Sequence, residues 1–485
     1  MMNLTAKEIT KAVNGQLIQG SPLNRLKGIS TDSRSLKAGE LFIALKGERF
    51  DGHHFVNDTL ARGAAGLIVE KGFSLKDMSS AKKDVPLIQV ADTLKALGDL
   101  ASSWMQQNNA TTVAITGSNG KTTTREMAAT ILEHSHRVLK PEHNWNNLIG
   151  LPLTLLRLNQ NHEIAILEMG MNRKGEIKRL SQIAKPHIGL ITTISPVHLE
   201  YLKTLQNVAQ AKGELFDSLT SENHAVINVD DPLVVELSQQ CPAQKITFGI
   251  NTPAQVSATD ISPADYSTNH FTLNREGKSI PIVLKIPGIH NIYNALAAAS
   301  LATIFKLTLE EIKAGLERFT AFPARMETIP IGKNINIIND TYNANPKSME
   351  SALKTLAHLK GKGRGIAVLG DMLELGEASL NLHQQVGSLI KTLDLDKVFL
   401  IGNYAEVVAE SALAQGMDKK KIHIGKTHEQ IAQQLTKIIK EDDWILFKGS
   451  REMKIEKILK HFLKMRNDNS KAFSTTKTAP MNYNC

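Results

Sequence analysis

Cysteine and long apolar runs are both scarce in this sequence of 485 residues. The two cysteines are Cys241 and Cys485, and the second stands in a polar tail, so no disulfide framework is predicted and a reducing compartment is favoured. No apolar run approaches the roughly 18 residues of a membrane span, and the opening stretch MMNLTAKEITKAVNG lacks the apolar core of a signal peptide. We therefore expect a soluble, cytoplasmic protein without a membrane span.

The positive charge of the chain is concentrated at one end. The formal net charge is +9, but residues 454–485 hold seven basic and two acidic side chains and so carry +5 of it. The rest of the sequence carries only +4, which is not the footprint of a nucleic-acid-binding face. No nucleic-acid partner is predicted.

The length predicts about three domains, and the pattern of apolar runs divides the chain accordingly. In residues 1–90, short β-type runs at 41–45, 67–70 and 87–90 alternate with turns and amphipathic stretches, which predicts a small α/β domain. A helical pattern from Asp92 begins the second predicted domain, residues 91–324.

The second and third domains are both predicted to hold parallel sheets. From Thr112 onward, near-continuous apolar strands (TTVAITG, EIAILEMG, HIGLITTI, HAVINV) alternate with helices, as in a doubly wound α/β domain. Residues 254–286 are predicted to be antiparallel, and 290–319 helical. After the connector FPAR the alternation restarts (INIIND, GIAVLG, KVFLIG, DWILFKGS), which predicts a second open parallel sheet in residues 325–466. Residues 467–485 are polar and without periodicity, and are predicted to be a disordered tail.

The segment TVAITGSNGKTTTREM places a glycine-containing loop between an apolar strand and a helix. Gly117 and Gly120 allow backbone N–H groups to face phosphate oxygens, and the helix adds its positive dipole end. Lys121 suits the β- and γ-phosphates, and the Thr122 hydroxyl suits Mg²⁺. The loop is two residues shorter than the usual phosphate loop, and the alternative interpretation is an ordinary glycine-rich turn.

Two further polar residues follow neighbouring strands of the same predicted sheet. Glu168 ends the strand EIAILEMG, and His198 follows LITTISP. Ligands of open α/β sheets gather at these strand ends, and Mg²⁺ prefers hard oxygen donors such as a carboxylate. Taken singly, each residue is as well explained as a solvated acid or a structural histidine; their convergence with the phosphate loop favours a magnesium nucleotide site.

A series of motifs spread over residues 25–455 resembles the signatures of the Mur ligases, in the same order. They are TGSNGKTT, EHNWNNLIGLPLTLL, EMGMNRKGEI, HLEYLKT with AQAKGELF, GIHNIYNALAA, FPARME, NDTYNANPKSM, LGDMLELG and FKGSREMKIE. The resemblance implies a small N-terminal substrate domain, a central P-loop ATPase-like domain and a C-terminal Rossmann-like domain.

The resemblance also implies a reaction. ATP would phosphorylate the terminal carboxylate of UDP-N-acetylmuramoyl-tripeptide, and the amine of D-alanyl-D-alanine would attack the acyl phosphate. Within the family, TDSR and LFIALKGERFDGH resemble the N-terminal domain of the third and fourth ligases. NDTYNANP, and the absence of a DNPR motif from the sequence, favour the dipeptide-adding ligase over the one that adds diaminopimelate or lysine.

Residue by residue, the resemblance implies three groups of ligands. The ATP-binding residues are Gly117, Ser118, Asn119, Gly120, Lys121, Thr122, Thr123, Asn291, Asn294, Arg325 and Asp340. The Mg²⁺ residues are Thr122, Glu168, His198 and Lys212, of which Lys121, His198 and Lys212 are expected to be catalytic. The substrate residues are Ser33, Arg34, Lys46, Tyr342, Asn343, Asn345, Ser450 and Arg451.

Some of these residues have a plainer interpretation. The resemblance implies that Lys212 can be carbamylated, which would convert a cation into an oxygen donor; a plain lysine paired with a carboxylate is the alternative. Asn291 fits a helix cap as well as an adenine contact. Arg451 suits a carboxylate because its fork binds one bidentately, but a solvated arginine also fits, and Ser33, Arg34 and Lys46 suit an ordinary surface.

Other functions remain open at this stage. They are a different amide ligase of the same fold, a non-catalytic nucleotide-binding switch, and a nucleic-acid-dependent ATPase suggested by the basic C-terminus. The expected partners are small-molecule substrates only, and the expected state is a monomer. Because the ATP contacts are split between two domains, closure of the last domain onto the central one is also expected.

Overall fold

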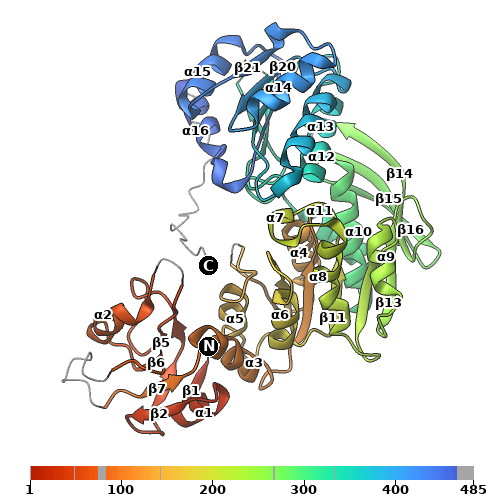
Figure 1. The fold of residues 1–485 in the computed structure, drawn as a ribbon. Coiled ribbons are helices and arrows are strands. Elements are labelled where there is room, and N and C mark those ends of the chain that lie inside the picture. The colour runs from red at the N-terminus through yellow and green to blue at the C-terminus, as the bar shows by residue number, and fades with distance from the viewer. Residues whose placement is uncertain are drawn as a thin grey trace.

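The computed structural model describes residues 2–47, 50–74, 84–142, 144–265, 268–332 and 334–466. The predicted tail, residues 48–49 of the GERFDGH loop and His143 of the EHNWNN motif lie outside the described residues. Three α/β domains follow one another in space as they do in the chain, with the first domain and the last at opposite ends of the molecule (Figure 1).

The first domain is built on a five-stranded sheet of order β2-β7-β6-β5-β4. Strands β4 to β7 are parallel and β2 is antiparallel to β7, while β1 and β3 form a separate antiparallel pair. All three predicted strands are observed, as β5, β6 and β7. The elements are β1 (Asn3–Thr5), α1 (Ala6–Ala12), β2 (Gln16–Gln19), β3 (Arg25–Lys27), β4 (Ile29–Ser30), β5 (Leu41–Ile43), η1 (Gly52–Phe55), α2 (Val56–Ala61), β6 (Gly66–Glu70) and β7 (Leu87–Val90).

The middle domain holds a nine-stranded sheet of order β16-β15-β14-β13-β12-β11-β8-β10-β9. It is parallel from β9 to the β13–β14 pair and antiparallel from β14 to β16, so the predicted change of strand direction is confirmed. Its elements are α3 (Thr93–Met105), β8 (Thr111–Thr116), α4 (Lys121–Leu132), β9 (Val138–Leu139), α5 (Gly150–Leu155), β10 (Ile164–Glu168), α6 (Glu176–Ala184), β11 (Ile188–Ile191), α7 (Leu199–Leu202), α8 (Leu205–Asp217), β12 (His224–Asn228), α9 (Pro232–Ser238), β13 (Gln244–Gly249), β14 (Val256–Asp265), β15 (Thr268–Arg275), β16 (Lys278–Leu284), α10 (Ile289–Ile304) and α11 (Leu309–Arg318).

Both faces of this sheet are covered, which explains its continuous apolar strands. Side chains alternate between the faces of a strand: Val113 and Ile115 of β8 belong to one apolar cluster, with α4 and α10, and Ala114 belongs to the other, with α3, α5 and α6. All three side chains are fully buried. The loops at the carboxyl end of the sheet therefore stand on a rigid base.

The last domain holds a six-stranded sheet of order β17-β18-β22-β19-β20-β21, parallel except for β17. The two edge strands are not predicted by the sequence, because both are only partly buried and β21 is also short. Its elements are β17 (Glu327–Ile331), β18 (Ile335–Asp340), α12 (Pro346–Leu359), β19 (Gly365–Gly370), η4 (Gly376–Ala378), α13 (Ser379–Thr392), β20 (Lys397–Ile401), α14 (Ala405–Ala414), η5 (Lys419–Lys421), β21 (Ile422–Ile424), α15 (His428–Ile438), β22 (Trp444–Lys448), η6 (Arg451–Met453) and α16 (Glu456–Met465).

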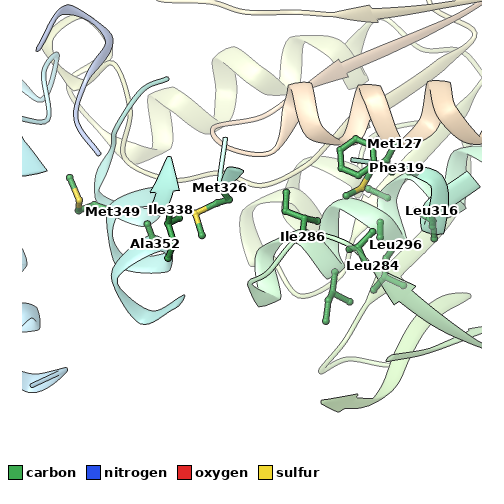
Figure 2. Packing of buried hydrophobic residues seen from close by; sticks show 14 of the residues in the cluster. Met127, Leu284, Ile286, Leu296, Leu316, Phe319, Met326, Ile338, Met349 and Ala352 are labelled. Atoms are coloured by element: carbon green, nitrogen blue, oxygen red, sulfur yellow. The ribbon is translucent and has the colours of Figure 1, made fainter. Parts of the chain in front are cut away.

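One apolar cluster continues from the middle domain into the last. It joins Ile286, before α10, to Met326, Ile338 and Met349 of the last domain. Figure 2 shows Met326 between Ile286 on one side and Ile338 on the other. The two domains therefore pack through buried side chains next to the carboxyl ends of their sheets.

None of the helices in the described part of the chain combines the length and the apolar character needed to cross a membrane.

Candidate active site

A cavity of about 1520 Å³ lies between the middle and last domains. Its walls come from the loops after β8, β10 and β11, from the start of α10, and from the last domain around β18 and α12. The predicted site residues that line it are Ser118, Asn119, Gly120, Lys121, Thr122, Thr123, Glu168, His198, Lys212, Asn291, Asn294, Arg325, Asp340, Tyr342, Asn343 and Asn345. Residues scattered over 228 positions of sequence thus meet in one place.

The glycine loop after β8 has no room for side chains at its two glycines. Gly117 has a φ of +144° and Gly120 one of +82°, and a Cβ atom would collide with Thr192 Oγ1 at the first and with Asn294 Oδ1 at the second. Ser118 fixes the loop to the segment that follows β11, since its N–H donates to the Thr193 carbonyl at 2.7 Å. Both glycines are therefore required by the fold itself, whatever the loop binds.

Lys121 and Glu168 form the charged floor of the cavity. The Lys121 ammonium donates to the Gly117 carbonyl (2.7 Å). Glu168 is 2% exposed and accepts hydrogen bonds from Thr122 Oγ1 (2.8 Å) and Asn146 Nδ2 (2.8 Å). Burial alone raises the pKa of Glu168, but the positive charges of Arg125, Lys121 and Arg325 together hold that pKa below its ordinary value. Glu168 is therefore a buried, ionised carboxylate at neutral pH.

Arg125, a residue that the sequence analysis did not select, forms a buried ion pair with the Glu168 carboxylate. It is fully buried in α4, and its guanidinium lies 3.2 Å from Glu168 Oε2 and 2.6 Å from Glu126 Oε1. Lys140 in turn contacts Glu126 Oε2 at 3.0 Å. Spacing along α4 gave no signal for Arg125, because its partner Glu168 lies on another element.

The residues around Glu168 fit a magnesium ion of the kind that binds with a nucleotide. Among the described residues, no group of three or more His, Cys, Asp or Glu side chains is arranged to hold a metal. Mg²⁺ does not need such a cage, because it is commonly held by one or two carboxylates together with substrate phosphates. The Thr122 hydroxyl and the Glu168 carboxylate, 2.8 Å apart, are oxygen donors beside the phosphate loop.

Lys212 lies in α8 and is 2% exposed. Within the described part of the chain its side chain has no hydrogen-bond or ion-pair partner, so the structure does not show the alternative of a lysine paired with a carboxylate. Burial, and then the charge of Lys121, hold the pKa of Lys212 well below its usual range. Burial disfavours the charged form of an amine, so the neutral form of the Lys212 side chain is accessible.

His198 precedes α7 and reaches across to the last domain. Its Nδ1 lies 2.5 Å from Oε2 of Glu374, which the sequence analysis also did not select. The hydrogen bond from His198 lowers the pKa of Glu374 below its ordinary value despite partial burial. This pair ties the middle domain to the last at the rim of the cavity.

The start of α10 forms a hydrogen-bonded chain of amides. Asn291 Nδ2 donates to the Pro287 carbonyl (2.6 Å), and its Oδ1 accepts from Asn294 Nδ2 (3.0 Å). The cap of α10 is Gly288, so the capping interpretation of Asn291 is wrong. Neighbouring His290 is partly exposed as a residue, but the loss of solvation around its ring lowers its pKa to about 4 and keeps the ring neutral.

The last domain contributes a second set of charges. The Arg325 guanidinium lies 3.8 Å from the centre of the Tyr342 ring, and Asp340 pairs with Lys448 at 2.5 Å. Lys448 is buried at the end of β22 and was missed, although its place at a strand end in WILFKGS is a signal of the kind used for Glu168.

Asn345 joins the two halves of the cavity. It caps α12, and its Nδ2 donates to Oδ1 of Asn119 in the glycine loop at 2.7 Å. The start of α12 in the last domain therefore lies beside the start of α4 in the middle domain.

Five predicted substrate residues lie outside the cavity. Ser33, Arg34 and Lys46 are in the first domain, where Arg34 pairs with Asp32 at 2.7 Å. Ser450 is buried and its hydroxyl accepts from the Leu373 N–H at 2.8 Å, while Arg451 is exposed and lies 3.8 Å from Glu456. The structure does not bring these residues to the phosphate loop, and their substrate roles stay predictions.

Three family models match successive parts of the chain. They describe a Mur ligase family catalytic domain at residues 25–105, a Mur ligase middle domain at 115–302, and a Mur ligase glutamate ligase domain at 324–451.

Whole proteins match over nearly the full length. The UDP-N-acetylmuramoyl-tripeptide–D-alanyl-D-alanine ligase of Bacillus subtilis is 36% identical over 464 residues, which cover 96% of this chain and 99% of that protein. A crystal structure of MurF from Acinetobacter baumannii superposes with a TM-score of 0.87 at 31% identity, covering 96% of this chain and 99% of that one. MurF ligase from Thermotoga maritima in complex with ADP superposes with a TM-score of 0.80 at 27% identity, over 92% and 99% of the two chains.

Proposed function

This chain belongs to the Mur ligase family, and from that membership we propose that it joins D-alanyl-D-alanine to UDP-N-acetylmuramoyl-tripeptide with hydrolysis of ATP to ADP. The observation that carries the choice of substrates is the 36% identity to the Bacillus subtilis ligase of that name over 96% of the chain. The ADP complex of the Thermotoga maritima protein supports the choice of nucleotide.

The reaction has two steps. An oxygen of the tripeptide carboxylate attacks the γ-phosphorus of ATP. The bond between the γ-phosphorus and the β,γ-bridging oxygen breaks, and ADP leaves with that oxygen. The dipeptide nitrogen then attacks the acyl carbon, loses a proton, and inorganic phosphate departs with the former carboxylate oxygen. Several anionic groups must come together in the first step, so charge neutralisation and positioning are the main catalytic demands.

The residues around the cavity are suited to those demands. Lys121 would lie against the β- and γ-phosphates cradled by the glycine loop, and Arg325 would reach the same phosphates from the last domain. Thr122, Glu168 and His198 would hold Mg²⁺, which neutralises phosphate charge when bound. Asn291 and Asn294 would contact adenine, and Asp340 the ribose. Tyr342, Asn343 and Asn345 would contact the dipeptide.

Lys212 fits a carbamate within this proposal. A neutral amine forms an N–C bond with CO₂ and releases a proton, and the product is an oxygen donor that suits a cation site. We expect Lys212→Ala to lose activity and short-chain carboxylic acids to restore part of it, because they supply the missing carboxylate. A failure of every such acid to restore activity in a folded variant would count against the carbamate.

The function is tested by phosphate release in a substrate panel. The expected result is release that requires both UDP-N-acetylmuramoyl-tripeptide and D-alanyl-D-alanine, with diaminopimelate, lysine and other amines inactive as acceptors. Release with neither substrate, or stimulation by DNA or RNA, would instead support a nucleotide switch or a nucleic-acid-dependent ATPase. Activity with a different amine would assign the chain to another branch of the family.

The monomeric state and the cytoplasmic location expected from the sequence are part of the proposal and remain predictions.

A further inference from the structure

The pair formed by His198 and Glu374 joins two domains at a single point of the cavity rim. The two residues are 176 positions apart, and Nδ1 of the imidazole lies 2.5 Å from Oε2 of the carboxylate. His198 lines the cavity in which Glu168 and Lys212 also lie. Glu374 comes from the loop that links β19 to η4 in the last domain.

The backbone of α7 in the middle domain and the backbone around Glu374 in the last domain are in close contact at this point. The Glu200 N–H donates to the Glu374 carbonyl at 3.1 Å, and a Cβ atom on Gly376 would lie 3.1 Å from Glu200 Cα. His198 and Glu374 both have left-handed backbones, with φ of +53° and +61°. Residues other than glycine adopt that conformation at a cost, so it is held by the surrounding structure. The contact is thus a defined docking point rather than a meeting of two mobile side chains.

The chemistry of the pair fixes which ring nitrogen carries the proton. An ionised carboxylate can only accept hydrogen bonds, so Nδ1 of His198 must donate. With Nδ1 as the donor, a ring that carries a single proton keeps a lone pair on Nε2, and among the described residues Nε2 has no hydrogen-bond partner. A carboxylate bonded to one nitrogen of an imidazole is the usual arrangement that orients the other nitrogen toward a metal.

We propose that Glu374 is a positioning residue, which reaches from the last domain to fix the tautomer and orientation of the His198 ring, so that the donor set facing the nucleotide is complete only when the last domain is docked. The catalytic benefit of this positioning rests on the proposed function, whereas the positioning itself rests on the geometry of the pair. It gives the last domain a role in building a magnesium site whose proposed ligands, Thr122, Glu168 and His198, all belong to the middle domain.

The first test is spectroscopic and uses the full chain without ligands. In nitrogen-15 histidine-labelled protein, with the His198 signals assigned by their loss in His198→Gln, we expect one tautomer protonated at Nδ1. Glu374→Ala and Glu374→Gln should both move these signals toward a mixture or toward the other tautomer. Glu377→Gln is the matched control, since it makes the same chemical change on an exposed residue three positions away. Wild-type signals in both Glu374 variants would overturn the proposal.

The second test is a double-variant cycle on the ligation rate. Replacing the carboxylate partner of a metal-directed histidine typically costs about 10- to 100-fold, so we expect a loss of that size in Glu374→Ala and a further loss of less than about 3-fold when Glu374→Ala is added to His198→Gln. Equal losses in both backgrounds would show that Glu374 acts by another route. If the wild type formed no pentapeptide product while the tautomer still changed, the proposed function would fail and the positioning role would stand.

Discussion

Replacing Lys121 by alanine is expected to lower the ligation rate by about 100- to 1000-fold, the usual cost of removing one preorganised donor from a site of developing charge. The ammonium is held beside the glycine loop by its bond to the Gly117 carbonyl (2.7 Å). Burial, together with Arg325, lowers the pKa of Lys121, and the nearby Glu168 carboxylate opposes that effect. A triphosphate would add negative charge at the same place and favour the protonated lysine further.

The measurement is the steady-state formation of the pentapeptide nucleotide. Lys121→Arg keeps the charge but changes the shape of the donor, so we expect it to recover only part of the rate. Lys178→Ala removes an exposed lysine of α6 outside the cavity and should leave the rate unchanged. A Lys121→Ala protein with the wild-type rate would refute the assignment of this loop to the triphosphate.

Arg125→Ala is expected to give the largest loss of stability of any single change considered, about 3–5 kcal/mol in the free energy of unfolding of the middle domain. The arginine is fully buried and lies between two carboxylates, Glu126 and Glu168. Without Arg125, the carboxylates of Glu126 and Glu168 remain poorly solvated and each loses a positively charged partner. Removing one partner of a buried ion pair costs more than removing the whole pair, because it leaves a charge without compensation.

Calorimetric unfolding of Arg125→Ala beside three further variants separates the loss of charge from the loss of volume. Arg125→Met fills most of the volume without the charge and should be nearly as unstable as Arg125→Ala, whereas Arg125→Lys should recover part of the stability. Lys95→Ala removes an exposed pair with Asp99 (2.5 Å) on α3 and should cost less than about 1 kcal/mol. Wild-type stability in Arg125→Met would show that the charge of Arg125 contributes nothing.

Much of the architecture was predictable because the sheets are covered on both faces. Strands such as β8 and β19 are buried along their length, and an uninterrupted apolar run between turn signals is a local property of the sequence. The strands β17 and β21 were missed because they lie at sheet edges, where partly polar residues form half-buried strands that no short window distinguishes from a loop.

The site was predictable where its parts follow one another along the chain. The glycine loop, Lys121 and Thr122 are adjacent, so their arrangement follows from one strand–loop–helix unit. Partners that meet only through tertiary structure gave no such signal. Arg125 and Glu374 both lie within sequence motifs, but neither has its partner in the same motif. Arg125 of α4 contacts Glu168 of β10, and Glu374 of the last domain contacts His198 before α7.

The hydrogen bond between the side-chain amides of Asn345 and Asn119 has a consequence for the order of events. It brings the amino end of α12 beside that of α4, and the start of α10 lines the same cavity, so the positive dipole ends of helices from two domains lie where a polyanion would sit. One of these three ends belongs to the last domain and is present only when that domain is docked. Thermodynamic linkage is reciprocal. If docking of the last domain strengthens binding of the polyanion by a given free energy, then binding of the polyanion favours the docked arrangement by the same free energy.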